Sequence, residues 1–228
     1  MVEAVVFDLD GVLVDSEPVW EEVRRGLVEE YGGGHWAEDT QSRLMGMSTG
    51  EWARYLRDEL GVDLPPERVA ELVIDRVAQR LTRDPPLIPG ASGAVRRLAD
   101  RWPLGLASSS PRRLIDAVLA ASDLAPAFSV TVSTEEVARG KPAPDVYLAV
   151  VEGLGAWPPS CVAVEDSTNG LRSAMAAGLR AIAVPQPRYP VDQAVLQAGI
   201  AVLPDLRDLT PDLIQSIDPD PTHRRGTG

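Results

Sequence analysis

Lysine, cysteine and histidine are scarce in this 228-residue chain, and each shortage restricts what the protein can be. Lys141 is the only lysine, although Lys and Arg together number 22, so every other cationic side chain is arginine. Cys161 is the only cysteine; no disulfide can form within the chain, which fits a reducing compartment. The two histidines, His35 and His223, have no partner at metal-ligand spacing, so we assign them no role.

Positive charge and long hydrophobic runs are also in short supply. The net charge of −12 argues against nucleic acid or an anionic membrane as a partner. The first residues have neither the basic nor the apolar region of a signal peptide. No apolar run is long enough to cross a bilayer, because Arg180 interrupts the best candidate at 174–184. We therefore expect a cytoplasmic monomer that has no membrane or nucleic-acid partner.

Short apolar runs, rich in β-branched residues, alternate with segments of helical spacing along most of the chain. Hydrophobic residues make up 44% and charged residues 25%, as in packed globular proteins. The alternation predicts an α/β fold, a doubly wound, Rossmann-like parallel sheet with helices on both faces. The predicted strands are Ala4–Phe7, Leu104–Ala107, Phe128–Val132, Cys161–Val164 and Ala181–Val184.

The segment between the first two predicted strands is longer than a crossover between parallel strands needs. Residues 16–83 carry helical patterns and no clear strand, so we predict a helical domain inserted into the sheet domain. The α/β core is then formed by residues 1–15 and 84–217. The tail at 218–228 has no apolar pattern and is expected to be disordered.

Polar and charged residues follow the predicted strands. In open α/β sheets, ligands bind outside the carboxyl ends of the strands, so these residues are candidates for one site. Acidic pairs follow the first and fourth strands, hydroxyls follow the second, and the loop after the third ends in a lysine. They are Asp8, Asp10, Ser108, Ser109, Ser110, Lys141, Glu165, Asp166 and Ser167.

This set of residues has a chemical logic. Carboxylates crowded at one edge need a cation, and hard oxygen ligands without His or Cys predict Mg²⁺. A metal, a lysine and a serine hydroxyl together suit a phosphoryl group. A carboxylate such as Asp8 can be the nucleophile that forms an aspartyl phosphate. Asp10, two residues along an extended strand, faces the same side and can act as general acid and base.

Four stretches, in order, resemble one family. FDLDGVLVDSE at 7–17, SSS at 108–110, GKPAPD at 140–145 and VEDS at 164–167 together resemble the haloacid dehalogenase superfamily, in its sugar-phosphate phosphatase and beta-phosphoglucomutase branch. The resemblance covers nearly the whole chain except the tail. It implies hydrolysis of a small phosphorylated metabolite, such as a sugar or polyol phosphate, through an aspartyl phosphate.

The resemblance also implies a role for each matching residue. Asp8 is the nucleophile and an Mg²⁺ ligand, and Asp10 is the acid/base that binds the metal through its backbone carbonyl. Asp166 binds Mg²⁺, supported by Glu165 directly or through water. The residues implied to bind phosphate are Ser108, Ser109 and Lys141.

The helical insertion matches the family's cap, a lid that excludes water during the reaction and reopens for product release. Candidate substrate-contacting residues on it are Trp20, Met47 and Ser48. Trp52 lies on the apolar stripe of its predicted helix, so we expect it in the core rather than against a sugar.

Structural explanations compete with several of these functional ones. The structural interpretation of Asp8 and Asp10 is that they form a turn or a helix cap after a strand. Ser110 is expected to cap a helix that has Pro111 as its first residue, which leaves Ser108 free to bind phosphate. The structural interpretation of Glu165 and Asp166 is that they lie in the first turn of a helix, where acidic residues are favoured.

Two rival functions stay open. A hexose-phosphate mutase of the beta-phosphoglucomutase type needs a cation in the insertion to hold a second phosphate, and the matching loop, 44–49, has none; Arg43 lies nearby but is displaced. A phospho-accepting receiver domain shares the acids, the hydroxyl and the lysine, but it lacks the insertion and the Asp-x-Asp spacing. A dehalogenase has no need of Asp10, and a phosphonate-cleaving enzyme would need a lysine in the insertion.

Overall fold

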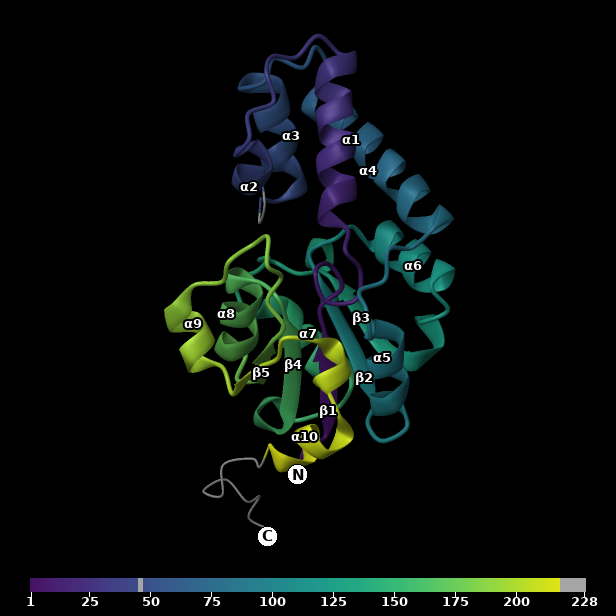
Figure 1. The fold of residues 1–228 in the computed structure, drawn as a ribbon, viewed down its shortest axis with the longest axis vertical. Helices are drawn as coiled ribbons and strands as arrows, with labels where there is room; N and C mark the ends of the chain where they lie inside the picture. The colour runs from purple at the N-terminus through teal and green to yellow at the C-terminus, as the bar shows by residue number, and fades with distance from the viewer. Residues whose placement is uncertain (45–46, 218–228) are drawn as a thin grey trace.

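The central sheet is built from the apolar runs seen in the sequence. The computed structural model describes residues 1–44 and 47–217, so the predicted tail at 218–228 lies outside the described residues. Within these residues the sheet has six strands, all parallel, in the order β3-β2-β1-β4-β5-β6 (Figure 1). The strands are β1 (Ala4–Phe7), β2 (Leu104–Ser108), β3 (Phe128–Ser133), β4 (Cys161–Glu165), β5 (Arg180–Ala183) and β6 (Ala201–Val202). The predicted α/β class is confirmed.

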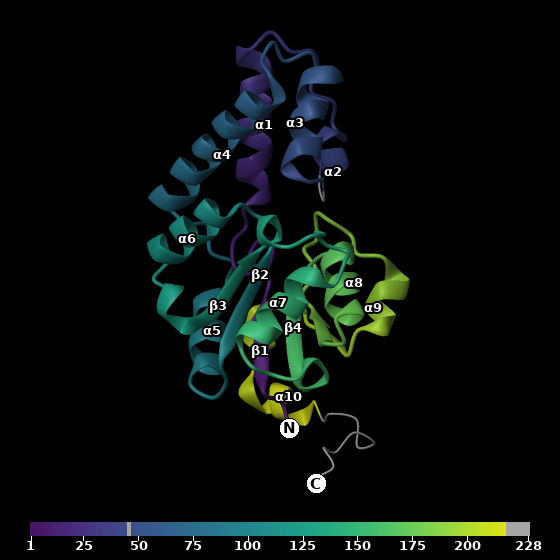
Figure 2. The same ribbon diagram turned by 180° about the vertical axis from the view of Figure 1, so that it is seen from behind.

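Both faces of the sheet are apolar and both are covered by helices. Val5 and Phe7 pack in one buried cluster with α5 (Ala91–Ala99) and α6 (Arg112–Ala121). Their neighbour Val6 packs in the other cluster with α7 (Asp145–Gly153) and α8 (Thr168–Ala176), as Figure 2 shows from behind. Alternate strand residues point to opposite faces, so a doubly covered strand must be apolar throughout. The other helical segments described in the core are α9 (Gln193–Ala198), α10 (Pro211–Ser216) and the 3₁₀ turns Ala125–Ala127, Thr134–Glu136, Pro158–Ser160 and Leu206–Asp208.

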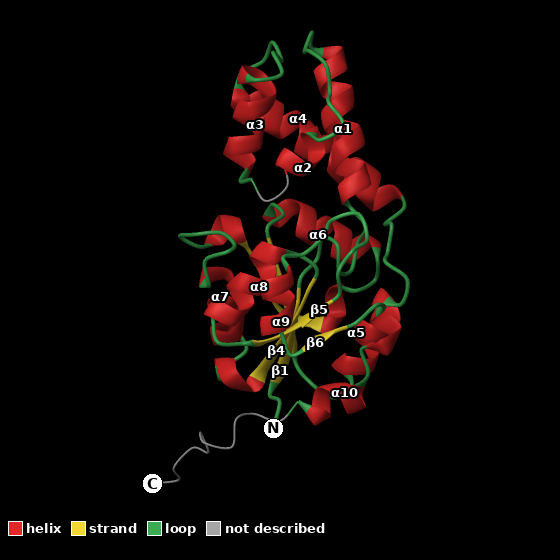
Figure 3. Cartoon of the chain, turned by 60° about the vertical axis from the view of Figure 1, so that its left-hand side comes forward, coloured by secondary structure: helices red, strands yellow, loops and turns green. Residues whose placement is uncertain are grey.

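Four helices follow β1 and lie together beyond the carboxyl ends of the strands (Figures 1 and 3). Helix α4 packs against α1, α3 and the core helix α6, so the apolar cluster of one sheet face continues into the insertion. They are α1 (Glu17–Glu30), α2 (Thr40–Leu44), α3 (Thr49–Asp58) and α4 (Pro66–Arg83). This helical content agrees with the pattern at 16–83, and that boundary stays a prediction. Among the described residues, no helix combines the length and apolarity needed to cross a membrane.

Candidate active site

The end of β1 places two carboxylates at the carboxyl edge of the sheet. Asp8 is 5% exposed, and its N–H donates to the carbonyl of Val164 on β4 at 3.0 Å, so it is fixed as part of the sheet. Asp8 and Asp10 line one cavity, while Leu9 between them is buried in the core. Gly11 follows with φ +80°, and a Cβ there would lie 1.9 Å from Oδ2 of Asp166. Glycine is therefore required both for the turn and for this close approach.

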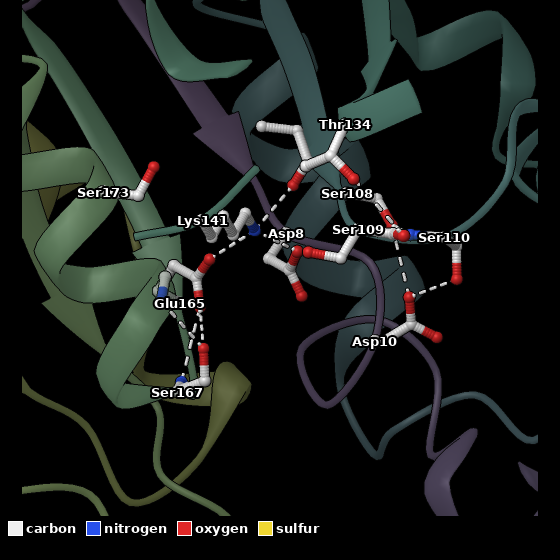
Figure 4. A network of polar contacts seen from close by, with 12 residues as sticks. Asp8, Asp10, Ser108, Ser109, Ser110, Thr134, Lys141, Glu165, Ser167 and Ser173 are labelled. Atoms are coloured by element: carbon white, nitrogen blue, oxygen red, sulfur yellow. Dashed lines mark hydrogen bonds and ion pairs between the residues drawn. The ribbon is translucent and has the colours of Figure 1, made fainter. Parts of the chain in front are cut away.

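Lys141 is enclosed by acceptors. Its ammonium donates to Oδ1 of Asp8 at 2.6 Å, to Oε1 of Glu165 at 2.6 Å and to the carbonyl of Ala107 at 3.0 Å (Figure 4). Its side chain is only 6% exposed. Burial acts to lower the pKa of Lys141, but the charges of Asp8 and Glu165 outweigh burial and raise this pKa above its ordinary value. The lysine is thus a permanent cation between two buried carboxylates.

Glu165, at the end of β4, is fully buried and has several partners. Its Oε1 also accepts a hydrogen bond from the hydroxyl of Tyr147 at 2.8 Å. Its Oε2 accepts from the hydroxyl of Ser167 at 3.1 Å and from the N–H groups of Asp166 and Ser167 at 3.2 and 3.3 Å. These contacts hold Glu165 rigidly against Lys141. Glu165 and Asp166 lie before α8, whose N-cap is Ser167, so neither opens the helix.

A group of three acids can hold a metal ion. Asp8, Glu165 and Asp166 each offer a carboxylate oxygen within 4.8 Å of the others. Burial raises the pKa of Asp8 well above its usual range, and Lys141 only partly opposes it. Burial, and then the charges of Glu165 and Asp8, raise the pKa of Asp166 in the same way. One ammonium is too little charge for this cluster, and a divalent cation bound by oxygen would relieve the repulsion. These residues fit such an ion.

Asp10 is held by three hydroxyls instead of by the acid cluster. Ser16, the residue before α1, donates to its Oδ1 at 2.5 Å. Ser108 and Ser110 donate to its Oδ2 at 3.2 and 2.8 Å. The expectation that Ser110 caps a helix is wrong: α6 begins at Arg112, and Pro111 stands in the N-cap position. The hydroxyl of Ser110 serves Asp10 instead.

The two serines predicted to bind phosphate occupy different places. Ser109 is exposed and lines the cavity with Asp8, Asp10 and Lys141. Ser108 is fully buried, and its hydroxyl also accepts the N–H of Ser110 at 2.9 Å. Ser108 therefore lies behind the cavity wall, where it helps to position Asp10.

The cavity measures about 450 Å³ and includes residues that the sequence reasoning missed. The sequence analysis considered the residues that follow the first four predicted strands and not those that follow the fifth. The loop after β5 contributes Arg188 and Tyr189 to the cavity. Glu17 was part of a recognised stretch but received no role. The residues that line the cavity are Asp8, Asp10, Glu17, Ser109, Lys141, Asp166, Ser167, Thr168, Asn169, Arg188, Tyr189, Pro190 and Val191.

None of the three residues predicted to contact substrate from the insertion lines this cavity in the described part of the chain. Trp20 is 7% exposed, and its ring packs edge-on against Trp52 with centroids 6.1 Å apart. Met47 lines a separate hollow on α3. Ser48 is exposed and forms the N-cap of α3, where its hydroxyl donates to Glu51 at 2.6 Å. Trp52 is 3% exposed, as its place on an apolar stripe predicted.

The fold and the site define a class of protein. A parallel α/β sheet that presents a paired Asp-x-Asp, a buried lysine and an acidic cluster at its carboxyl edge is suited to phosphoryl chemistry. The chain belongs to the haloacid dehalogenase-like hydrolases, whose family model matches residues 2–178. The predicted family resemblance is confirmed.

Individual relatives agree with this family. The chain is 35% identical to Hexitol phosphatase B of Escherichia coli (strain K12) over 91% of its own length and 94% of the relative's. It is 35% identical to a phosphorylated carbohydrates phosphatase of Thermotoga maritima, over 88% and 93% of the two chains. The solved structure of CbbY from Rhodobacter sphaeroides in complex with phosphate superposes with a TM-score of 0.81 at 26% identity, covering 92% and 96%. The protein is thus a phosphoric monoester hydrolase, as predicted, and the receiver-domain alternative is set aside.

Proposed function

We propose that this protein is a Mg²⁺-dependent phosphatase that hydrolyses a small sugar or polyol phosphate through an aspartyl phosphate on Asp8. The observation that carries the proposal is the position of the Asp8 carboxylate, at the cavity wall and ion-paired with Lys141 at 2.6 Å. The relatives' names support the substrate class, since two of them are phosphatases of hexitols or phosphorylated carbohydrates.

Asp8 and Asp10 have separate roles in the proposed reaction. Lys141 holds Oδ1 of Asp8, so Oδ2 is the oxygen that attacks phosphorus and forms the acyl phosphate. Asp10 in its protonated form gives its proton to the departing alkoxide. As a carboxylate, Asp10 then takes a proton from the water that attacks the acyl phosphate. That step releases inorganic phosphate and restores Asp8. Ser16, Ser108 and Ser110 orient Asp10 for both proton transfers.

Charge on the phosphoryl group is offset from two sides. Lys141, which would exchange one of its three acceptors for a phosphoryl oxygen, and the exposed hydroxyl of Ser109 bind the phosphoryl group from the core. Asp8 and Asp166, with support from Glu165, hold the metal ion, which when bound neutralises phosphoryl charge and favours attack. Mg²⁺ is the ion proposed because the donor set is all oxygen and has no His or Cys.

Helices α1 to α4 are proposed to form a cap that closes over the cavity and limits water access during the first transfer. Ser16 joins Asp10 to the start of this insertion, so a movement of α1 is transmitted to the acid/base residue. The predicted boundaries, 16–83 for the cap and 1–15 with 84–217 for the core, are kept in this proposal.

A mutase function is less well supported than a phosphatase function. A mutase needs a cation in the insertion that faces the site, and Arg43 is instead ion-paired with Asp39 at 2.7 Å on the exposed surface. Residues 47–49 bring no cation, and residues 45–46 lie outside the described part. Within the described part of the insertion, a transfer between two positions of one sugar therefore has no evident second phosphate site.

The decisive experiment assays phosphate release from a panel of phosphorylated metabolites with Mg²⁺ for three variants. Asp8→Asn should abolish turnover because an amide cannot form the acyl phosphate. Asp10→Asn should slow turnover by roughly 10² to 10⁴, the usual contribution of general acid–base catalysis. Asp15→Asn is the matched control, since Asp15 is exposed in the same loop and lies outside the cavity lining. Wild-type rates in Asp8→Asn protein would refute the mechanism.

The metal can be tested separately. We expect EDTA to remove activity and Mg²⁺ to restore it, because the acid cluster has too few cations of its own. Asp166→Ala should raise the Mg²⁺ concentration needed for half-maximal activity, measured by titration of the metal-free enzyme. An unchanged titration curve would remove Asp166 from the metal site, and full activity in metal-free buffer would remove the metal from the mechanism.

A further inference from the structure

One carboxylate in the cavity takes no part in the phosphoryl chemistry. Glu17 is the first residue of α1, and it lines the cavity together with Arg188 and Tyr189 from the loop after β5. Partial burial raises the pKa of Tyr189, and the charge of Glu17, on the same cavity lining, adds to this rise. Glu17 thus forms part of the cavity where the insertion meets the core, apart from the acid cluster of Asp8, Glu165 and Asp166.

A chain of buried polar groups holds this carboxylate in place. The side-chain amide of Gln41 on α2 donates to Oε2 of Glu17 at 2.7 Å, and Arg24 on α1 approaches Oε1 of Gln41 at 3.4 Å. Gln41 is 4% exposed and Arg24 is 6% exposed. The guanidinium lies 4.7 Å from the ring centre of Trp20 and 5.0 Å from that of Trp52. The two tryptophans that sequence reasoning considered as sugar-stacking or core residues are therefore the walls around this arginine.

This chain of polar groups contains a buried arginine and a buried amide, and one of its members reaches the cavity. Burying an arginine and an amide inside a small helical bundle is unfavourable unless both are paired. Burial lowers the pKa of Arg24 to about 10, although the charge of Glu17 opposes this. Nε of Arg24 has no hydrogen-bond partner among the described residues, so the arginine is only partly satisfied. Burial raises the pKa of Glu17, and the charge of Arg24 opposes this rise. Glu17 is the member of the chain that reaches the cavity.

The remaining acceptor on Glu17 suits a hydroxyl. Gln41 occupies Oε2, and Oε1 has no hydrogen-bond partner among the described residues. An ionised carboxylate accepts hydrogen bonds and donates none, so it selects donor groups such as hydroxyls. The cavity lining already holds the acids Asp8, Asp10 and Asp166 against the cations Lys141 and Arg188. An additional acid there disfavours a second phosphate or a carboxylate on the substrate and favours a neutral, hydroxyl-rich chain.

We propose that Glu17 is a specificity-determining residue whose carboxylate binds the hydroxyl groups of the substrate's neutral polyhydroxy chain, with Gln41 and Arg24 as the residues that position it. The proposal rests on the proposed phosphatase function and adds how the substrate is chosen. The cavity, at about 450 Å³, has the size of a small-molecule site. Specificity then lies at the start of α1, and the loop with Met47 and Ser48 is not needed for it.

The test compares two substrates that differ in hydroxyl groups. For each variant, kcat/KM is measured with a hexitol phosphate and with p-nitrophenyl phosphate, which carries no hydroxyl chain. Glu17→Ala should lower kcat/KM for the hexitol phosphate at least about tenfold more than for the aryl phosphate, as expected for a lost hydrogen bond to a charged group. Glu29→Ala is the matched control, because Glu29 is exposed on the same helix. It should leave the ratio of the two values unchanged.

A second variant tests the positioning residues. Gln41→Leu keeps a similar volume but removes the donor to Glu17, so it should raise KM for the hexitol phosphate more than it lowers kcat, with a smaller effect on the aryl phosphate. If Gln41 has only a structural role, Gln41→Leu should lower kcat/KM for both substrates by the same factor. A further readout is activity on a sugar bisphosphate, which should rise relative to the hexitol phosphate in Glu17→Gln protein because a repelling charge is lost.

The outcomes distinguish a failure of this inference from a failure of the proposed phosphatase function. If wild-type protein releases phosphate from neither substrate, the phosphatase proposal fails and the inference fails with it. If the wild type is active and Glu17→Ala and Gln41→Leu lose activity equally on both substrates, or lose none, the phosphatase proposal stands and the specificity role of Glu17 is refuted.

Discussion

A lysine ammonium has three N–H donors, and the one lysine of this chain uses three acceptors. The acceptors are carboxylate oxygens of Asp8, directly after β1, and of Glu165 on β4, and the carbonyl of Ala107 on the neighbouring strand β2. A guanidinium is a planar fork with five donors, longer and wider than an ammonium. The geometry around Lys141 therefore gives a physical reason why arginine, which serves everywhere else in the chain, is absent here.

This reasoning predicts the effect of Lys141→Arg. The charge is kept, but the fork cannot meet the three acceptors without displacing Asp8 or Glu165. A misplacement of about 1 Å is enough to lower the rate on the order of 10²-fold. Turnover of the purified variant should fall by at least that factor in a phosphate-release assay. Arg139→Lys serves as the control, because Arg139 is exposed in the same loop and pairs only with Asp145 on the surface. Near-normal turnover of Lys141→Arg would show that the lone lysine is an accident of composition.

Single residues were predictable where they follow a strand and unpredictable where they act through packing. Asp8, Lys141 and Asp166 stand at strand ends or in the loops after them, and the topology brings strand ends together. Tyr147 donates to Glu165, yet in the sequence it belongs to the apolar stripe of α7 and looks like any core residue. Gln41 and its hydrogen bond to Glu17 likewise depend on how α2 packs against α1, which no local pattern encodes.

At the scale of elements, the apolar runs located β1 to β5, whereas β6, α9 and α10 were not predicted. Strand boundaries were right to within one residue, because buried parallel strands are short apolar runs. The sixth strand, β6, was missed because two residues, Ala201 and Val202, are too few to show a period. The start of α6 was misplaced because the sequence Ser-Ser-Ser-Pro offers several cap positions, and the hydrogen bond from Ser110 to Asp10 decided between them.

Helix α8 provides a prediction about how an element supports the site. Gly170 lies in its first turn, and a Cβ there would stand 1.9 Å from the side-chain carboxyl carbon of Glu165. Glu165 cannot move aside easily because Lys141, Tyr147 and Ser167 hold it. Gly170→Ala should therefore lower both turnover and the melting temperature, even though alanine is the better helix former by about 1 kcal/mol.

Gly26→Ala is the control for this substitution. Gly26 lies inside α1, and an added Cβ meets nothing within 4 Å. This change should stabilise the protein by roughly 0.5–1 kcal/mol in urea unfolding and leave turnover unaffected. If Gly170→Ala is also stabilising and fully active, the close approach of α8 to Glu165 has no role in the site.

At the scale of the whole molecule, the site lies where two bodies meet. The core brings the residues of the proposed phosphoryl transfer from its strand ends (Figure 4), and the start of α1 brings Glu17 to the cavity lining. The sequence predicted a helical insertion, but it could not indicate which face of four packed helices turns toward the sheet. For that reason the sequence pointed to Trp20, Met47 and Ser48 and not to Glu17, which lines the cavity. Cytoplasmic location, the monomeric state and the lack of a nucleic-acid partner stay predictions.

The lone lysine also offers a probe of the whole molecule. Its side chain lines the cavity but is only 6% exposed, and its ammonium donates to three acceptors on β2, on β4 and directly after β1, so we expect an acylating reagent to react with it only when these contacts open. We expect a short pulse of an amine-acylating reagent to leave the peptide that contains Lys141 unmodified in the folded protein. Across a urea series, the midpoint of Lys141 acylation by mass spectrometry should coincide with the midpoint of unfolding by circular dichroism, as for a cooperative domain. Acylation of Lys141 at urea concentrations that leave the circular dichroism unchanged would instead mean that the site opens locally while the sheet stays folded, and the burial of this ammonium would then not depend on the cooperative fold.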